Sequence, residues 1–310
     1  MAWAMVFPGQ GSQSLGMLHD ALPHAVVAAT LAQASEVLGC DVPALMRDGP
    51  LEQLNRTEWT QPILLAASVA LYRLWRAEGG AEPDYMAGHS LGEYSALVCA
   101  GALDYAEALQ LVRERGRLMQ SAVPAGVGLM AAILGLEDTR VVEICRAASA
   151  EQAVVEAVNF NAPGQVVIAG HRAAVIAAMD ACKAAGAKRA LELAVSVPAH
   201  SSLMQPAAQQ LAVSLAACQL RLPQIRVLHN IDAAPAGDVA DLQQRLLSQL
   251  YHPVQWVATG EALRAHAVTQ VLECGPGKVL VGLMKRIDGL QVLPLDGEAA
   301  RAEAHAALAM

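Results

Sequence analysis

Residues 85–94 read YMAGHSLGEY, and this stretch fits two patterns at once. Ser90 and Glu93 form S-x-x-E, the capping box found at the start of many helices. Gly88, Ser90 and Gly92 form G-x-S-x-G, the sharp turn between a strand and a helix that presents a nucleophilic serine. The first pattern makes Ser90 a structural cap, and the second makes it a candidate catalyst.

The flanking sequence favours the catalytic interpretation. Apolar residues predict a short strand over residues 84–87 and a helix over residues 91–99, which is the context of a serine elbow. A capping box leaves Gly92 unexplained, because glycine in the first helical turn costs about 0.5–1 kcal/mol relative to alanine. An elbow explains this glycine, since strand and helix approach closely there and a Cβ would obstruct them. Ser90 is therefore predicted to be a nucleophile whose backbone can still begin the helix.

Strand and helix patterns alternate along much of the chain and predict an α/β fold with a parallel sheet. From about residue 123 the order changes to βαββαβ, the ferredoxin-like arrangement. We therefore predict a discontinuous main domain, residues 1–122 and 196–310, and an inserted small domain, residues 123–195. The alanine-rich end, residues 298–310, predicts a loosely held helix. A further helix is predicted to begin with Thr60 as its cap.

The composition limits the class of protein. The chain has 310 residues, of which 55% are hydrophobic and 16% charged, and these values suit a packed core rather than disorder. A net charge of −8 argues against general affinity for nucleic acid. The six cysteines form no C-x-x-C pair, so no metal site is expected. No apolar run reaches ~18 residues and no signal-peptide pattern is present, so we expect a cytoplasmic protein that does not enter a membrane.

A nucleophilic serine needs a base, and the sequence offers several histidines. His89 is adjacent to Ser90 and should point away from it on a sharp turn, so its expected role is to orient the elbow. His200 follows the strand predicted over residues 189–195, in a loop of the kind that often carries catalytic groups. A structural histidine is the alternative interpretation there. The candidates for the base are His171, His200, His229, His252 and His266.

Arg115 lies on the apolar face of a helix predicted over residues 104–121. Its neighbours at helical spacing are Leu111, Val112, Leu118 and Met119. An arginine in such surroundings is rarely buried without an anionic partner. It could form a structural ion pair, extend to solvent, or hold a substrate carboxylate through two hydrogen bonds. These alternatives stay open on this reasoning.

Seven motifs resemble those of the malonyl-CoA:acyl carrier protein transacylases, the free-standing bacterial enzymes of fatty-acid synthesis. The resemblance extends from about residue 3 to residue 290, in order and with the spacing of the family. The motifs are FPGQGSQ (7–13), GHSLGEY (88–94), RGRLMQ (115–120), NFNAPGQVVIAG (159–170), SVPAH (196–200), QLYHPVQW (249–256) and ECGPGKVL (273–280). It implies an α/β-hydrolase-like large domain that carries the ferredoxin-like insert.

The resemblance also implies a reaction. Ser90 would take the malonyl group from malonyl-CoA as an ester, with His200 as the base. The phosphopantetheine thiol of acyl carrier protein would then accept the group. Backbone N–H groups of Gln10 and Leu91 would form the oxyanion hole, and Arg115 would pair with the malonyl carboxylate.

The family orients its histidine through a carbonyl near Gln249 instead of an acidic side chain. The expected partners are malonyl-CoA and acyl carrier protein, without a cofactor, a metal, nucleic acid or a membrane, and the expected state is a monomer. His252 stands where the family suggests asparagine or another neutral polar residue, and we expect it to be solvated. A basic patch for the carrier could draw on Lys183, Lys188, Arg189, Lys285 and Arg286, although such scattered charges more often form ordinary solvated surface.

Three other functions remain open. A malonyl loader for a malonate decarboxylase or a polyketide system would share all these residues. A serine thioesterase or esterase would use water as the acceptor, and both Arg115 and the absence of an HGGG-type sequence argue against it. A carrier-binding module without activity would retain the fold but form no acyl-enzyme, and the intact serine, histidine and arginine argue against it.

Overall fold

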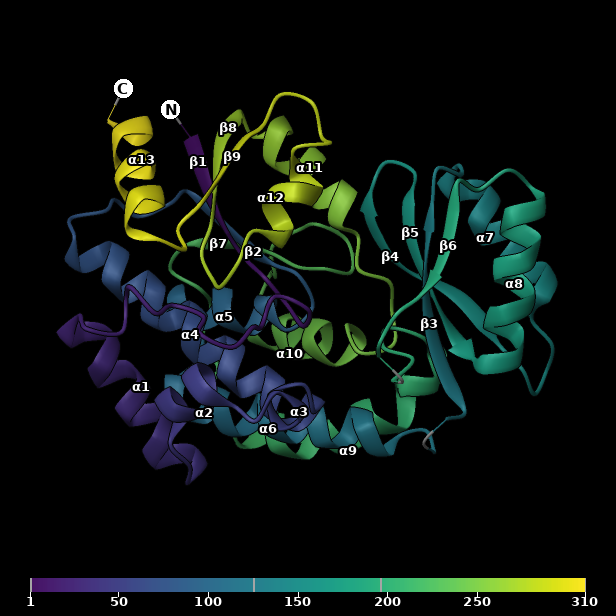
Figure 1. Ribbon diagram of the computed structural model, residues 1–310, viewed down its shortest axis with the longest axis horizontal. Helices are drawn as coiled ribbons and strands as arrows, with labels where there is room; N and C mark the ends of the chain where they lie inside the picture. The colour runs from purple at the N-terminus through teal and green to yellow at the C-terminus, as the bar shows by residue number, and fades with distance from the viewer. Residues whose placement is uncertain (1, 125, 196, 310) are drawn as a thin grey trace.

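The computed structural model describes residues 2–124, 126–195 and 197–309, and its strands form two sheets (Figure 1). The larger sheet is parallel throughout, in the order β7-β2-β1-β8-β9. The mixed α/β architecture with a parallel sheet confirms the predicted fold class. Its strands are β1 (Ala2–Phe7), β2 (Tyr85–Gly88), β7 (Arg226–Leu228), β8 (Val268–Glu273) and β9 (Gln291–Pro294).

Helices cover both faces of this sheet, so its central strand is buried on both sides. On β1, Trp3, Met5 and Phe7 pack into one apolar cluster, while Ala4 and Val6 pack into another. The first cluster includes α4 and α6, and the second includes α11 and α12. The helices of this part of the chain are α1 (Ala25–Leu38), α2 (Val42–Asp48), α3 (Leu51–Leu54), α4 (Thr57–Ala77), α5 (Gly92–Cys99), α6 (Tyr105–Ser121), the 3-10 helix η1 (Ser202–Met204), α9 (Gln205–Ala217), α10 (Val239–Ser248), α11 (Trp256–Ala265), α12 (Val279–Met284) and α13 (Glu298–Leu308).

The second sheet is antiparallel, in the order β4-β5-β3-β6. Its elements follow the predicted βαββαβ order: β3 (Gly128–Leu134), α7 (Asp138–Ala148), β4 (Val155–Ala162), β5 (Gln165–His171), α8 (Arg172–Ala184) and β6 (Arg189–Glu192). One face packs against α7 and α8, and the other carries Met130, Val158 and Val167. The predicted domain bounds remain a prediction. Residues 1, 196 and 310, on which some of those bounds fall, lie outside the described residues.

Two local predictions are wrong. Helix α4 begins at Thr57 with Arg56 as its cap, and Thr60 lies inside the helix with its hydroxyl donating to the Leu54 carbonyl at 2.6 Å. Helix α13 is firmly held, because Arg301 is only 2% exposed and pairs with Glu78 and with an aspartate near the N-terminus. Composition gives no sign of these ion pairs, because α13 consists mostly of alanine.

No single helix among the described residues is long and apolar enough to cross a membrane. The pair α1 and α2, which is bent by 105°, passes that test only when the two are taken together.

Candidate active site

Residues 88–92 form a strained elbow between β2 and α5. Ser90 has a φ of 51°, in the left-handed region that side chains rarely adopt. A Cβ on Gly88 would lie 1.8 Å from the Gly92 carbonyl carbon. A Cβ on Gly92 would lie 2.0 Å from the carbonyl oxygen of Phe7 on β1. Both glycines are therefore required by the close approach of strand and helix, as the elbow interpretation expects.

The capping box is not formed. The Ser90 N–H donates to the side-chain oxygen of Asn230 at 2.7 Å, so it does not meet Glu93. The Glu93 carboxylate is instead buried against His229 and the Asn230 backbone. The hydroxyl of Ser90 is directed towards the side chains of His200 and Arg115.

His200 lies against the hydroxyl of Ser90. Its Nε2 is 2.8 Å from Ser90 Oγ, and its Nδ1 is 2.7 Å from the Gln249 carbonyl oxygen. Because a carbonyl only accepts, Nδ1 carries the proton and Nε2 is left to accept from the serine hydroxyl. The imidazole is 3% exposed. Burial, assisted by the charge of Arg115, lowers the pKa of His200 to about 3, so the ring is neutral at physiological pH.

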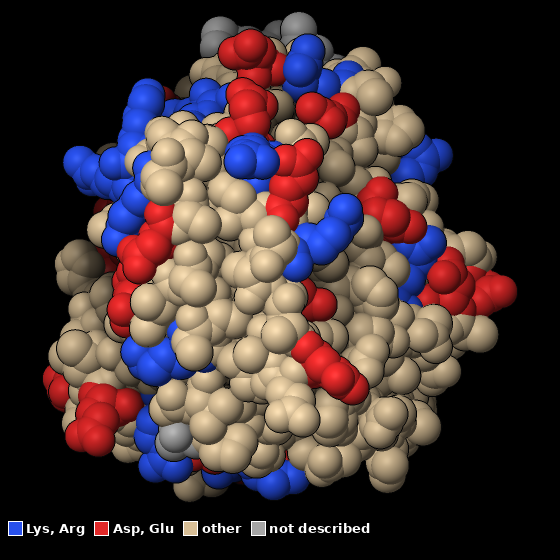
Figure 2. Space-filling view, turned by 90° about the vertical axis from the view of Figure 1, so that its right-hand side faces the viewer, with Lys and Arg blue, Asp and Glu red and all other residues tan. Residues whose placement is uncertain are grey.

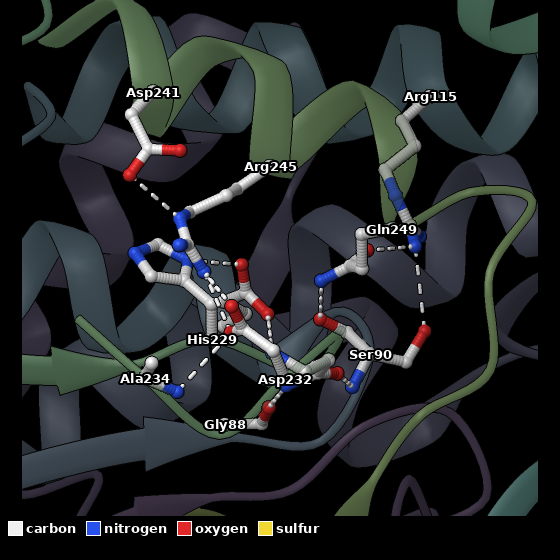
Figure 3. Close-up of polar contacts among 11 residues, drawn as sticks. Gly88, Ser90, Arg115, His229, Asp232, Ala234, Asp241, Arg245 and Gln249 are labelled. Carbon is white, nitrogen blue, oxygen red and sulfur yellow. Dashed lines mark hydrogen bonds and ion pairs between the residues drawn. The ribbon is translucent and has the colours of Figure 1, made fainter. Parts of the chain in front are cut away.

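Arg115 projects from α6 into the same site and is 1% exposed, which excludes the solvent-extended alternative. Its guanidinium donates to the side-chain oxygens of Gln61 and Gln249, both at 2.8 Å, and to Ser90 Oγ at 3.3 Å (Figure 3). Within the described residues, no carboxylate forms an ion pair with it. Burial lowers the pKa of this guanidinium. A buried cation with only neutral partners is a suitable receptor for an anionic group.

A cavity of about 170 Å³ joins these residues. It is lined by Ser90, Arg115 and His200, and also by Gln10 and Leu91. Gln10 follows β1 and Leu91 follows the nucleophile, so two neighbouring strands supply the two turns; Phe7 and Gly88, the last residues of those strands, are paired. Across the part of the chain that the structure describes, neither backbone N–H donates to a protein acceptor. Two free donors beside a serine can stabilise an oxyanion.

All six predicted site residues therefore lie together, with Gln249 behind the serine. His89 Nε2 donates to Asn161 Oδ1 at 2.7 Å, and the His89 ring forms a T-shaped contact with Trp256, so the ring packs against these two residues at the edge of the cavity. Its expected role in orienting the elbow stays a prediction. Burial lowers the pKa of His89. His252 is exposed and its Nδ1 donates to the Ser248 carbonyl at 2.9 Å.

Sequence reasoning gave no role to several polar residues of the site, among them Gln61 and Asn230. Gln61 had a detectable signal, because it is a polar residue within a long apolar helix. Asn230 had none, since it comes from a loop 140 residues away from the serine that it contacts.

The face of the molecule on the side of the small sheet carries both positive and negative side chains. Figure 2 shows basic and acidic side chains interspersed over this face. Lys183 pairs with Asp180 on α8. Arg286, another member of the predicted basic patch, donates to the Pro163 carbonyl and the Gln165 side chain and so links α12 to the turn between β4 and β5. No group of three or more potential metal-ligating His, Cys, Asp or Glu side chains occurs among the described residues.

Comparison with known proteins gives one consistent result. Residues 4–281 match the acyl transferase domain family. The malonyl CoA-acyl carrier protein transacylase of Escherichia coli K12 is 54% identical over 304 residues, which are 97% of this chain and 98% of that protein. The Bacillus subtilis enzyme of the same name is 43% identical, covering 92% of this chain and 90% of that one.

Solved structures agree with these relatives. An acyl carrier protein S-malonyltransferase from Vibrio cholerae has a TM-score of 0.95 at 52% identity, covering 98% of this chain and 100% of that one. A malonyl-transacylase solved with a type II PKS acyl-carrier protein has a TM-score of 0.96 at 52% identity, covering 98% and 99%.

Proposed function

Because this chain belongs to the acyl transferase family, among the malonyl CoA-acyl carrier protein transacylases, we propose that it transfers a malonyl group from malonyl-CoA to the phosphopantetheine thiol of an acyl carrier protein. One observation carries the proposal at the level of residues. A serine hydroxyl lies within hydrogen-bond distance of both a neutral, buried imidazole and a buried guanidinium that lacks an anionic partner among the described residues. This arrangement suits a nucleophile that must receive an acyl group bearing a free carboxylate.

In the first half of the reaction, Ser90 Oγ attacks the thioester carbonyl while His200 Nε2 accepts its proton. The carbonyl oxygen becomes negatively charged and receives hydrogen bonds from the N–H groups of Gln10 and Leu91. When the tetrahedral intermediate collapses, the carbon–sulfur bond breaks and His200 returns the proton to the departing coenzyme A thiolate. The malonyl group remains as an ester on Ser90.

The second half reverses these roles. The phosphopantetheine thiol attacks the ester carbonyl, and His200 accepts the thiol proton. Collapse of the second intermediate breaks the carbon–oxygen bond, and His200 protonates Ser90 as it leaves. The Gln249 carbonyl keeps the imidazole oriented through both steps and stabilises its positive form. A cofactor has no part in this sequence, because both half-reactions exchange one acyl bond for another.

Arg115 supplies selectivity for malonyl over acetyl groups. The malonyl carboxylate can receive two charge-assisted hydrogen bonds from the guanidinium. An acetyl group has no anion to offer, so it leaves a buried cation without a counter-charge, and such mismatches are strongly disfavoured. We further propose that the protein is cytoplasmic and acts as a monomer. Light scattering during gel filtration would check the monomeric state.

For the identity of the carrier protein, one observation favours a second candidate. A relative of 52% identity was solved with a type II PKS acyl-carrier protein, so a polyketide carrier is an alternative acceptor. Discharging the malonyl-enzyme with each carrier in parallel distinguishes the two.

Mass spectrometry tests the proposal directly. The purified protein is mixed with malonyl-CoA or with acetyl-CoA, quenched rapidly, and its intact mass and the peptide containing Ser90 are measured. We expect a malonyl adduct on Ser90, much less acetyl adduct, and loss of the adduct when carrier protein is added. Discharge by water alone at the same rate would indicate a thioesterase. No adduct and no released coenzyme A would indicate a carrier-binding module.

A further inference from the structure

The loop that follows β7 contacts the nucleophile elbow through one side chain. Asn230 Nδ2 donates to the Gly88 carbonyl at 2.6 Å, and Asn230 Oδ1 accepts the Ser90 N–H at 2.7 Å. A single amide group therefore bridges the residues on either side of His89. Asn230 is buried, so water is not available to replace either contact.

Gln249 holds the other side of the serine. Its side-chain Nε2 donates to the Ser90 carbonyl at 3.0 Å. That carbonyl belongs to the same planar peptide group as the Leu91 N–H, so holding one fixes the direction of the other. Asn230 holds the peptide group that precedes Ser90, and Gln249 holds the one that follows it. Together they constrain a residue whose positive φ is unfavourable unless its surroundings maintain it.

Two buried side chains keep Asn230 in place. Its backbone N–H donates to Glu93 Oε2 at 2.9 Å, and His229 Nδ1 donates to Glu93 Oε1 at 2.8 Å. Both Glu93 and His229 are fully buried. Glu93 lies on α5, the helix that begins directly after the elbow. The loop therefore contacts the elbow through the Asn230 side chain and the following helix through Glu93.

Arg245 joins the same loop to α10. Its guanidinium donates to both oxygens of Asp232, at 2.6 and 2.7 Å, and to Asp241 at 2.9 Å (Figure 3). Helix α10 ends at Ser248, one residue before Gln249. The two amides that hold Ser90 therefore come from one braced unit, the loop after β7 together with α10.

We propose that Asn230 is a positioning residue for the acyl transfer. It aligns the peptide group before Ser90 so that Oγ faces His200 and the Leu91 N–H faces the developing oxyanion. Asn230 does not line the cavity that holds Ser90 and Arg115. It should therefore affect the rate of acylation while leaving the affinity for malonyl-CoA nearly unchanged. The proposal takes its substrate from the proposed function, but its geometry does not depend on that substrate.

The test uses Asn230→Asp, which keeps the acceptor for the Ser90 N–H but sets a carboxylate oxygen against the Gly88 carbonyl. Two rates are measured per folded molecule: labelling of Ser90 by a fluorophosphonate, and single-turnover formation of the malonyl-enzyme across a range of malonyl-CoA concentrations. We expect both rates to fall by about 10- to 100-fold, because small misplacements of reacting groups have effects of this size. The half-saturating malonyl-CoA concentration should change less than about twofold.

The matched control is Gln152→Glu, which adds the same charge at an exposed turn and should leave both rates unchanged. Wild-type rates in Asn230→Asp, or a loss expressed only as weaker malonyl-CoA binding, would overturn the proposal. If Asn230→Asp does not fold, Asn230→Ser, which is too short to span both groups, must show the same loss of rate. If the wild-type protein reacts with fluorophosphonate but never with malonyl-CoA, the proposed function fails, and the labelling rates still decide the role of Asn230.

Discussion

Replacing Arg115 with alanine should remove the preference for malonyl groups. Arg115 lies on α6 and makes its contacts with neutral partners, two glutamine side chains and the hydroxyl of Ser90. In the malonyl complex it would instead have a buried carboxylate partner. Removing one member of a buried charge pair costs about 3 kcal/mol. That energy corresponds to a loss of about 100-fold in the malonyl-over-acetyl ratio of kcat/KM.

The substitution also has a predictable side effect on His200. The charge of Arg115 helps to hold the pKa of His200 low, so its removal should raise that pKa. Acylation by an uncharged acyl-CoA should then begin to fail at a higher pH in the variant than in the wild type. Two glutamine oxygens also lose their donor, which lowers stability, but a buried cation without a counter-charge is removed at the same time, so we expect only a modest net change in melting temperature.

Rapid-quench acylation with malonyl-CoA and acetyl-CoA measures the ratio, with thermal melting to confirm that the variant is folded. Arg117→Ala is the matched control, because Arg117 lies on the same helix but is exposed and paired with Glu114. Arg115→Lys should give an intermediate ratio, since lysine keeps the charge but cannot form the two-pronged contact. An unchanged ratio in Arg115→Ala would refute the assignment and make this arginine structural.

Four further outcomes are expected. Ser90→Ala should form no malonyl-enzyme by mass spectrometry, and turnover at the wild-type rate would place the nucleophile elsewhere. The acylation rate of the wild type should stay level as pH falls through 6.5 and decline only towards pH 3, because the base is His200 with a pKa of about 3; a decline centred near 6.5 would contradict this. In the unfolded chain His200 takes up a proton near pH 6.5, whereas in the folded protein its pKa is about 3. The free energy of unfolding should therefore decrease as pH falls from about 6.5 towards 3, which urea titrations at several pH values would reveal. Gly92→Ala should lower stability by about 2–3 kcal/mol and abolish acylation, because the new Cβ would meet the Phe7 carbonyl at 2.0 Å; a wild-type melting temperature would mean that the elbow can relax.

The sequence predicted the fold well where periodicity and turn chemistry agree. The βαββαβ order of the small sheet and the helix from residue 138 to residue 148 could be read directly, because amphipathic spacing and short turns are local properties. The start of α4 was misplaced because the hydroxyl of Thr60 satisfies the Leu54 carbonyl inside the helix instead of capping it. The anchoring of α13 depends on partners more than 200 residues away, which no local pattern contains.

The candidate site divides in the same way. The spacing of Gly88, Ser90 and Gly92 predicts the elbow, because local backbone geometry sets that spacing. Arg115 could be recognised as unusual, but only its burial and its neutral partners separated the alternatives. The sequence gives no sign of Asn230, because its role depends only on contacts with the elbow in the folded protein.

The two sheets contribute differently to the walls of the cavity. Ser90, His200 and Arg115 come from parts of the chain outside the small sheet, whereas Met130 and Val167, which also line the cavity, come from its strands. The small sheet thus adds apolar residues to a cavity whose reacting groups come from the rest of the chain. Substitutions on β3 and β5 can reshape the room for an acyl substituent without moving the reacting groups. In an engineered or naturally diverging lineage, the small sheet is one place where preferences among substituted malonyl groups can change while Arg115 keeps the requirement for a carboxylate.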